Sequence, residues 1–163
     1  MNNQSINWKD PLYLESFLTE EEKNILITSK EFCKMKLLPR VIKDNNNKFF
    51  DKNLYKDFGK LGFLGPTING YGCAGVSNIS YGLIAKEFEA VDSGYRSAIS
   101  VQSSLVMHPI YKFGSEDQKN KYLPKLAHGE IIGCFGLTES ESGSDPSSIK
   151  TSFIETADEY IIN

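Results

Sequence analysis

The hydrophobic pattern of this chain changes its period once, near residue 130, and this change limits the folds that the chain can adopt. Before that point apolar residues recur at helical spacing, as Leu54, Phe58 and Leu61 do. After it, the apolar run 131–137 has the continuous character of a strand. A run of helices followed by strands indicates two successive units, a helical domain and then a β domain.

Helix-start signals divide the first unit into separate helices. Thr19 and Ser115 each open a capping box, in which a hydroxyl and a side chain three residues later satisfy free N–H groups. Ser77 and Asp92 are further N-cap residues, and the asparagine-rich stretch 44–47 predicts a break. We therefore predict a mainly α fold, with a helical domain at residues 1–129 and the incomplete start of a β domain at residues 130–163.

Composition excludes several classes of function. The chain has 163 residues, of which 40% are apolar and 24% charged, as in ordinary globular proteins. Its net charge of −3, without a basic block, argues against a nucleic-acid partner. Because no apolar run approaches the roughly 20 residues that span a bilayer, we expect no membrane partner. The start has no signal or transit peptide, so we expect a cytoplasmic protein, or a mitochondrial matrix protein if the source is eukaryotic.

The three cysteines, Cys33, Cys73 and Cys134, are too far apart to form a ligand pair, so we expect reduced thiols and no metal site.

Residues 70–75 match the G-x-G-x-x-G pattern of dinucleotide-binding proteins. That pattern is meaningful only when a buried strand precedes it and a helix begins inside it. Here Gly62, Gly65 and Pro66 lie just before it, and these residue types are unfavourable in a central strand. We therefore interpret residues 70–75 as a connecting loop rather than as a nicotinamide site.

Arg96 is one of only two arginines, and the helix expected from Asp92 places it on one face with Ser100. A guanidinium beside a hydroxyl can bind both oxygens of a carboxylate, and the small Ser97 lets a ligand approach closely. Glu89 lies just upstream and can orient the arginine. The alternative is an ordinary surface pair of Arg96 and Glu89, which contributes under about 1 kcal/mol to stability.

Thr138 and Glu139 follow the apolar run and lead into a loop rich in serine, glycine and aspartate, at residues 140–145. Its hydroxyls and the free N–H groups of its turns suit a phosphate or a pyrophosphate. The preceding run 131–137 supplies an edge along which a flat ring system can lie. The sequence therefore predicts half of a cofactor site.

Taken together, these segments resemble the acyl-CoA dehydrogenase family, and within it the glutaryl-CoA dehydrogenases. The resemblance extends from Trp8 to the end of the chain and is most specific in residues 64–76, 91–110 and 135–145. It implies an N-terminal helical domain, a central β domain and a C-terminal four-helix domain, of which this chain matches the first and the opening of the second. Ser140 stands where the family commonly has proline, which removes no ligand.

The resemblance implies FAD as cofactor and acyl-CoA as substrate. Thr138 would bond the flavin's pyrimidine edge, Ser144 would lie near the pyrophosphate, and Arg96 would take the distal carboxylate of glutaryl-CoA. The implied cofactor-binding residues are Phe135, Gly136, Leu137, Thr138, Glu139, Gly143 and Ser144. The implied substrate-binding residues are Arg96, Ser97, Ser100, Glu89 and Ser144.

The implied activity is oxidative decarboxylation of glutaryl-CoA to crotonyl-CoA, a step of lysine and tryptophan degradation. The resemblance also implies a homotetramer and electron transfer to electron-transfer flavoprotein. The family's catalytic base is a glutamate of the C-terminal domain, so no residue here is assigned that role, and we expect this chain alone to be inactive. The alternatives are part of another short-chain acyl-CoA dehydrogenase, an inactive remnant, or a non-catalytic helical interaction module.

Overall fold

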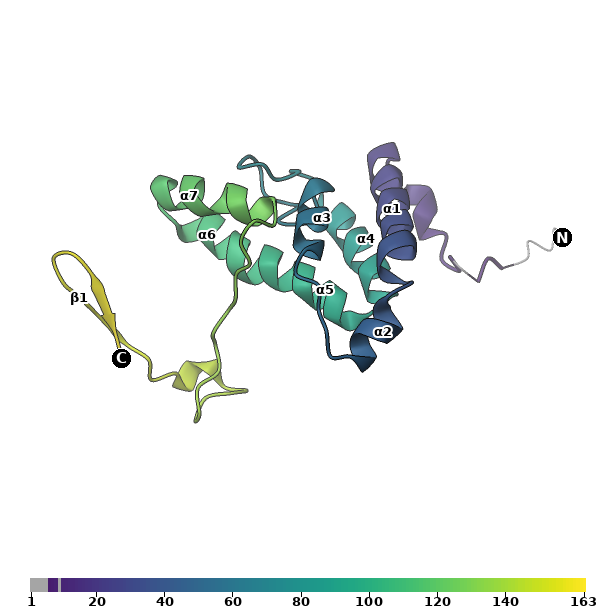
Figure 1. Cartoon of the computed structure of the whole chain (residues 1–163). Coiled ribbons are helices and arrows are strands. Elements are labelled where there is room, and N and C mark those ends of the chain that lie inside the picture. The colour runs from purple at the N-terminus through teal and green to yellow at the C-terminus, as the bar shows by residue number, and fades with distance from the viewer. Residues whose placement is uncertain (1–5, 9) are drawn as a thin grey trace.

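The computed structural model describes residues 6–8 and 10–163. Figure 1 shows the helices packed into one body, which we call the helical body. The α-helices are α1 (Glu20–Phe32), α2 (Val41–Asn46), α3 (Leu54–Lys60), α4 (Asn78–Glu89), α5 (Ser93–Ser100), α6 (His108–Phe113) and α7 (Glu116–Ala127). The π-helical segments are η2 (Cys33–Leu37) and η3 (Val101–Met107), and the 3-10 turns are η1 (Leu14–Phe17) and η4 (Pro146–Ser148). The strands β1 (Phe153–Glu155) and β2 (Tyr160–Ile162) pair antiparallel.

The mainly α fold predicted from the sequence is confirmed, and so are its helix starts. Thr19 and Ser115 form complete capping boxes at α1 and α7. The Ser77 hydroxyl accepts a hydrogen bond from the backbone N–H of Ser80, and the Asp92 carboxylate accepts one from Gly94. Local capping chemistry therefore sets where four of the helices begin.

Two expectations from the sequence are wrong, one about a chain break and one about a strand. The break expected at 44–47 comes later, because α2 runs to Asn46. The Arg40 guanidinium forms ion pairs with the carboxylates of Asp44 and Asp51, with N···O distances of 2.6 and 3.0 Å. These pairs support α2 and the turn after it. Residues 131–137 are extended but form no strand, since no other described strand lies beside them to complete a ladder.

Four phenylalanines form the centre of the core. Phe32 of α1, Phe58 of α3, Phe63 of the following loop and Phe88 of α4 are all buried. Their ring centroids lie 5.2 to 6.0 Å apart, mostly edge to face. Such contacts are the favoured geometry of aromatic rings and bind α1, α3 and α4 into one unit.

The Glu22 carboxylate joins the starts of two helices. One of its oxygens accepts hydrogen bonds from the backbone N–H and from the hydroxyl of Thr19, and both donor–acceptor distances are 3.0 Å. The other accepts from the hydroxyl of Ser77, the N-cap of α4, over 2.9 Å. The Thr19 N–H and then the Ser77 hydroxyl lower the pKa of Glu22, because they bond its charged form.

The end of α7 lies directly on the backbone of α3. A Cβ atom at Gly59 would lie 2.6 Å from the carbonyl oxygen of Ala127. Gly129, whose φ is +66°, leaves no room for a Cβ beside the carbonyl oxygen of Tyr55. These two glycines therefore allow the end of α7 to pack directly against α3.

Residues 70–75 form a connecting loop, as predicted. The residues before them are turns and bends instead of a strand, and α4 begins only after the loop, at Asn78. The context that a nicotinamide fingerprint requires is therefore not present here.

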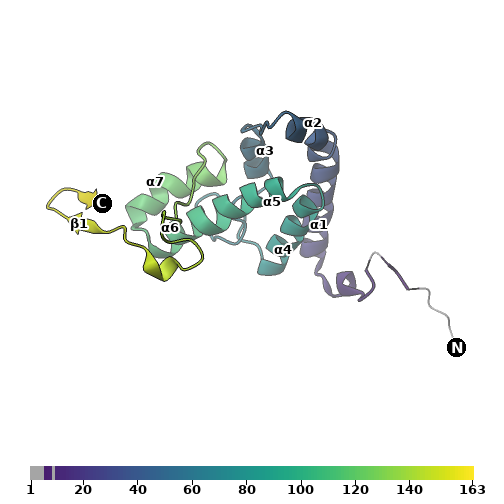
Figure 2. The same cartoon turned by 90° about the horizontal axis from the view of Figure 1, so that it is seen from below.

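After the helical body the chain runs through the projecting segment, residues 134–163, to the β hairpin at the end opposite the N-terminal segment (Figure 1). Seen from below, α5, η3 and α6 follow one another as one rod beside α7 (Figure 2). No helix in the described part of the chain is long and apolar enough to cross a membrane.

Candidate substrate and flavin site

Arg96 lies on α5 with its guanidinium fixed at one end. Its Nε donates to a carboxylate oxygen of Glu89 over 2.7 Å, and the other oxygen of Glu89 accepts from the Ser93 hydroxyl over 2.7 Å. Arg96 and then Ser93 lower the pKa of Glu89, since both stabilise the carboxylate. Within residues 6–8 and 10–163, the two terminal nitrogens of Arg96 have no acceptor. The arginine is thus oriented and still able to bind an anion.

An apolar groove of about 370 Å³ lies along another face of α5. Ser97 and Ala98 of α5 form one wall, and Tyr55 of α3 forms another. Arg96 and Ser100 lie on the same helix but do not line the groove. The full lining is Phe50, Lys52, Tyr55, Gly94, Ser97, Ala98, Val101 and Ile132. The groove has the size and polarity to hold a short acyl chain.

Residues 134–138 form an open edge. The side chains of Phe135 and Leu137 are 48% and 43% exposed, and Gly136 and Thr138 are also exposed. None of the five residues makes a hydrogen bond to another described residue. Their backbone and side chains are therefore free to meet a planar ligand.

Glu139 is already engaged within the chain. Its two carboxylate oxygens accept hydrogen bonds from the backbone N–H groups of Lys150 and Thr151, over 2.8 and 2.9 Å. Hydrogen bonds, first from Thr151 and then from Lys150, lower the pKa of Glu139. This carboxylate closes a loop, and each of its oxygens keeps a further lone pair that can accept a hydrogen bond.

The loop after Glu139 presents two free N–H groups. Ser142 is buried and donates its hydroxyl proton to the carbonyl oxygen of Asp145 over 2.7 Å, which tightens the turn. Gly143 and Ser144 stand at its exposed tip, and their N–H groups meet no acceptor in the described chain. An exposed turn with free N–H groups is suited to a phosphate oxygen.

The structure gathers the predicted residues into two clusters. Arg96, Ser97, Ser100 and Glu89 lie together on the helical body, whereas residues 135–144 lie on the projecting segment. The link between them is Ile132, which lines the groove immediately before the open edge. The other groove walls, among them Phe50 and Tyr55, carry no local sequence signal because only the tertiary fold brings them to α5.

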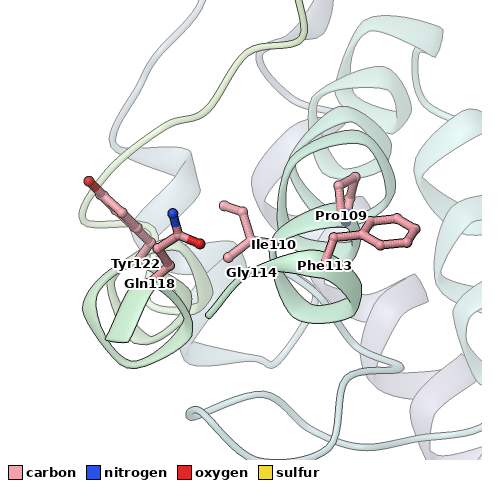
Figure 3. A pocket seen from close by; sticks show the side chains of 6 residues that line it. All are labelled: Pro109, Ile110, Phe113, Gly114, Gln118 and Tyr122. Atoms are coloured by element: carbon pink, nitrogen blue, oxygen red, sulfur yellow. The ribbon is translucent and has the colours of Figure 1, made fainter. Parts of the chain in front are cut away.

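A second groove, of about 450 Å³, lies between α6 and α7 (Figure 3). It is lined by Pro109, Ile110, Phe113, Gly114, Gln118 and Tyr122, and none of the predicted site residues faces it. Gln118 already caps α7 by accepting a hydrogen bond from Ser115. With no charged group in its lining, this groove offers no group for acid–base or anion chemistry.

No group of three potential metal-ligating side chains occurs among the residues that the structure describes.

Comparison with protein families assigns the class of this chain. The pattern of the acyl-CoA dehydrogenase N-terminal domain matches residues 19–130, which is more than half of the chain. The chain therefore belongs to the acyl-CoA dehydrogenase family.

Individual relatives refine this class. The chain is similar to a glutaryl-CoA dehydrogenase from Mycobacterium smegmatis solved in complex with FADH2, at 45% identity and a TM-score of 0.89, covering 92% of this chain and 39% of that one. It is 34% identical over 147 residues to an acyl-CoA dehydrogenase of Bacillus subtilis, covering 90% of this chain and 39% of the relative. It is 35% identical over 151 residues to the mitochondrial isovaleryl-CoA dehydrogenase of Bos taurus, covering 90% of this chain and 35% of the relative. The chain thus spans less than half the length of the relatives it matches.

Proposed function

We propose that this chain is the N-terminal part of a flavin-dependent acyl-CoA dehydrogenase that oxidises and decarboxylates glutaryl-CoA. One observation carries the substrate assignment, namely an oriented Arg96 with free terminal nitrogens on the helix that also forms a wall of an apolar groove. The apolar walls suit the methylene chain, and the guanidinium suits a carboxylate at its end. The similarity to the glutaryl-CoA dehydrogenase of Mycobacterium smegmatis supports the same assignment.

FAD is the cofactor of this proposal, and the residues present fit it. The open edge at Phe135, Gly136, Leu137 and Thr138 leaves room for a planar ring, and Thr138 offers a hydroxyl to it. The free N–H groups at Gly143 and Ser144 suit the pyrophosphate. Bound FAD would supply the hydride acceptor, while the protein would supply orientation and exclude water.

The whole protein would remove an α-proton and a β-hydride from the substrate and then release carbon dioxide. We assign the general base to none of these 163 residues. Transfer of electrons to electron-transfer flavoprotein, a homotetrameric assembly and a location in the cytoplasm or mitochondrial matrix belong to the same proposal.

A second candidate is dehydrogenation of a neutral short-chain acyl-CoA. The Glu89 carboxylate is bound to Arg96 and offsets its charge, and the groove itself is apolar. If Arg96 serves only as half of this surface pair, the groove would accept an uncharged chain equally well.

The two candidates differ in one kinetic ratio. We would replace the matching N-terminal part of the Mycobacterium smegmatis glutaryl-CoA dehydrogenase with this chain and measure kcat/KM for glutaryl-CoA and for pentanoyl-CoA. Loss of a charge-assisted hydrogen bond, about 1.5–3 kcal/mol, predicts that Arg96→Ala lowers the value for glutaryl-CoA about ten- to a hundredfold and largely spares pentanoyl-CoA. The matched control is Lys86→Ala, which removes another exposed cation. Equal, small effects of Arg96→Ala on both substrates would support the second candidate.

A further inference from the structure

Gln102 is a fully buried amide in η3 that holds the chain where it leaves the helical body. Its Nε2 donates to the carbonyl oxygens of Leu126 and Ile131, over 3.1 and 3.0 Å. Its Oε1 accepts from the backbone N–H of Gly133 over 2.9 Å. One side chain therefore binds the end of α7 and the two peptide groups on either side of Ile132.

Gly133 allows the backbone of this segment to approach η3 closely. A Cβ atom at residue 133 would collide with the side chain of Val106, with Cγ2 only 2.8 Å away. Val106 follows Gln102 by four residues in η3, so both lie along the same stretch of the rod. The backbone at 131–133 thus rests directly on η3, and only glycine permits that approach.

Nothing in the described chain fixes the residues that follow. Residues 134–138 make no hydrogen bonds, and their side chains are exposed. The Gln102 amide is thus the last fixed point before the open edge. Along extended backbone, neighbouring side chains point to opposite sides, so a shift by one residue would exchange the faces that Leu137 and Thr138 present.

We propose that Gln102 is a positioning residue that sets the place and the register from which residues 134–138 leave the helical body. It also holds Ile132 in the wall of the apolar groove at α5, because the peptide groups on both sides of Ile132 are bound to Gln102. The positioning itself is a property of this chain, whereas its importance for flavin and substrate rests on the proposed function.

The neighbouring Ser103 provides a matched control. It is also buried in η3, but its hydroxyl accepts a hydrogen bond from the backbone N–H of Gly65 over 2.9 Å, in a different loop. Gln102→Met and Ser103→Ala each remove buried polar contacts from η3. Only the first removes them from residues 131–133.

Hydrogen exchange of backbone amides in the complete 163-residue chain tests the positioning without any ligand. We expect Gln102→Met to accelerate exchange at Gly133 at least tenfold relative to amides in α4, because the acceptor of that N–H is removed. Ser103→Ala should change exchange at Gly65 and leave Gly133 as it is. Unchanged exchange at Gly133 in Gln102→Met, or equal acceleration in both variants, would overturn the proposal.

A second pair of variants applies if Gln102→Met does not fold. Gly133→Ala should loosen residues 131–133 from η3, and adding Val106→Ala should restore slow exchange at residue 133 by removing the colliding methyl groups. If Gly133→Ala leaves exchange at residue 133 slow, the backbone does not depend on this close approach, and the proposal is wrong.

The flavin readout uses the chimera described above. Gln102→Met should raise the dissociation constant of FAD about tenfold, because it removes the two hydrogen bonds that hold residues 131–133. Ser103→Ala should leave that constant within about twofold, because Ser103 is hydrogen-bonded to Gly65 instead. A chimera with this chain's own sequence that binds no FAD would contradict the proposed function and leave the exchange result standing. If Gln102→Met leaves the dissociation constant of FAD unchanged, Gln102 has no role in flavin binding.

Discussion

The helical body and the projecting segment differ in what stabilises them. In the helical body, apolar side chains of distant helices meet in a continuous core, and the described residues leave no buried side-chain polar atom without a partner. In the projecting segment, Ser142 is the single buried residue, and Phe153 and Ile162 of the hairpin remain 65% and 72% exposed. Both regions contain residues that favour their secondary structure, but only one of them buries those residues.

This difference teaches that strand propensity alone does not make a sheet. The β1–β2 hairpin is formed by local pairing, and an isolated two-stranded hairpin is at best marginally stable in water. Residues 131–137 have the composition of a strand and remain without a ladder, since a strand requires a partner. Helices satisfy their own backbone hydrogen bonds, so the helical body does not share this dependence.

The largest expected contrast is between two phenylalanines. Phe88→Ala removes a fully buried ring from the centre of the core and should lower the free energy of unfolding by about 3–5 kcal/mol. Phe153→Ala removes an exposed ring of the hairpin and should change it by less than about 0.5 kcal/mol. Urea unfolding followed by far-UV circular dichroism measures both. Similar losses in the two variants would contradict the comparison.

A pair of glycines gives the next effect. Gly129→Ala forces a side chain into a positive φ and against Tyr55, which should destabilise the helical body by about 1–3 kcal/mol. Gly143→Ala is the control in the projecting segment, where a Cβ would meet nothing within 4 Å, and we expect a change within about 0.5 kcal/mol. Thermal unfolding midpoints compare the two, and an equally stable Gly129→Ala would show that α7 does not depend on this contact.

Glu22 gives a pH-dependent contrast. Its pKa is lowered in the folded chain, so its contribution to stability is present above the unfolded value of about 4.3 and is lost as pH falls through the folded pKa. Unfolding of the parent chain and Glu22→Gln should therefore differ at pH 7 and converge below about pH 4. Glu139→Gln should not change unfolding of the helical body at either pH, although hydrogen bonds also lower the pKa of Glu139. A pH-independent difference for Glu22→Gln would contradict the assigned role.

Thiol reactivity gives the smallest contrast. Burial raises the pKa of Cys73 to about 11 and, with a contribution from Glu87, that of Cys33 to about 12. The thiolate is the reactive form, so both should react slowly with iodoacetamide at pH 8, whereas the exposed Cys134 should be alkylated first. Mass spectrometry of a time course identifies the order. Labelling of Cys73 as fast as Cys134 would show that the loop before α4 is open.

The sequence predicted what local chemistry determines. Helix starts at Thr19, Ser77, Asp92 and Ser115 depend on hydrogen bonds within four residues, so each is visible in the pattern. The change of period near residue 130 coincides with the end of the helical body for the same reason.

The sequence did not predict what long-range packing determines. Phe50 and Ile132 line the groove at α5 because the fold brings them there, and Gln102 acts on peptide groups about thirty residues away. The break at 44–47 comes late because Arg40 supports α2 through Asp44. The roles of Arg96, Thr138 and Ser144 come from the family resemblance and stay predictions.

Backbone order parameters from NMR relaxation test most directly whether the chain is held up to residue 133 and free beyond it. We expect values near 0.85 through the helices and at residues 131–133, falling below about 0.6 at residues 134–138. In Gln102→Met the fall should begin earlier, at about residue 130. Order parameters at residues 134–138 as high as those in α5 would contradict the account, because that segment would then be held by something other than Gln102.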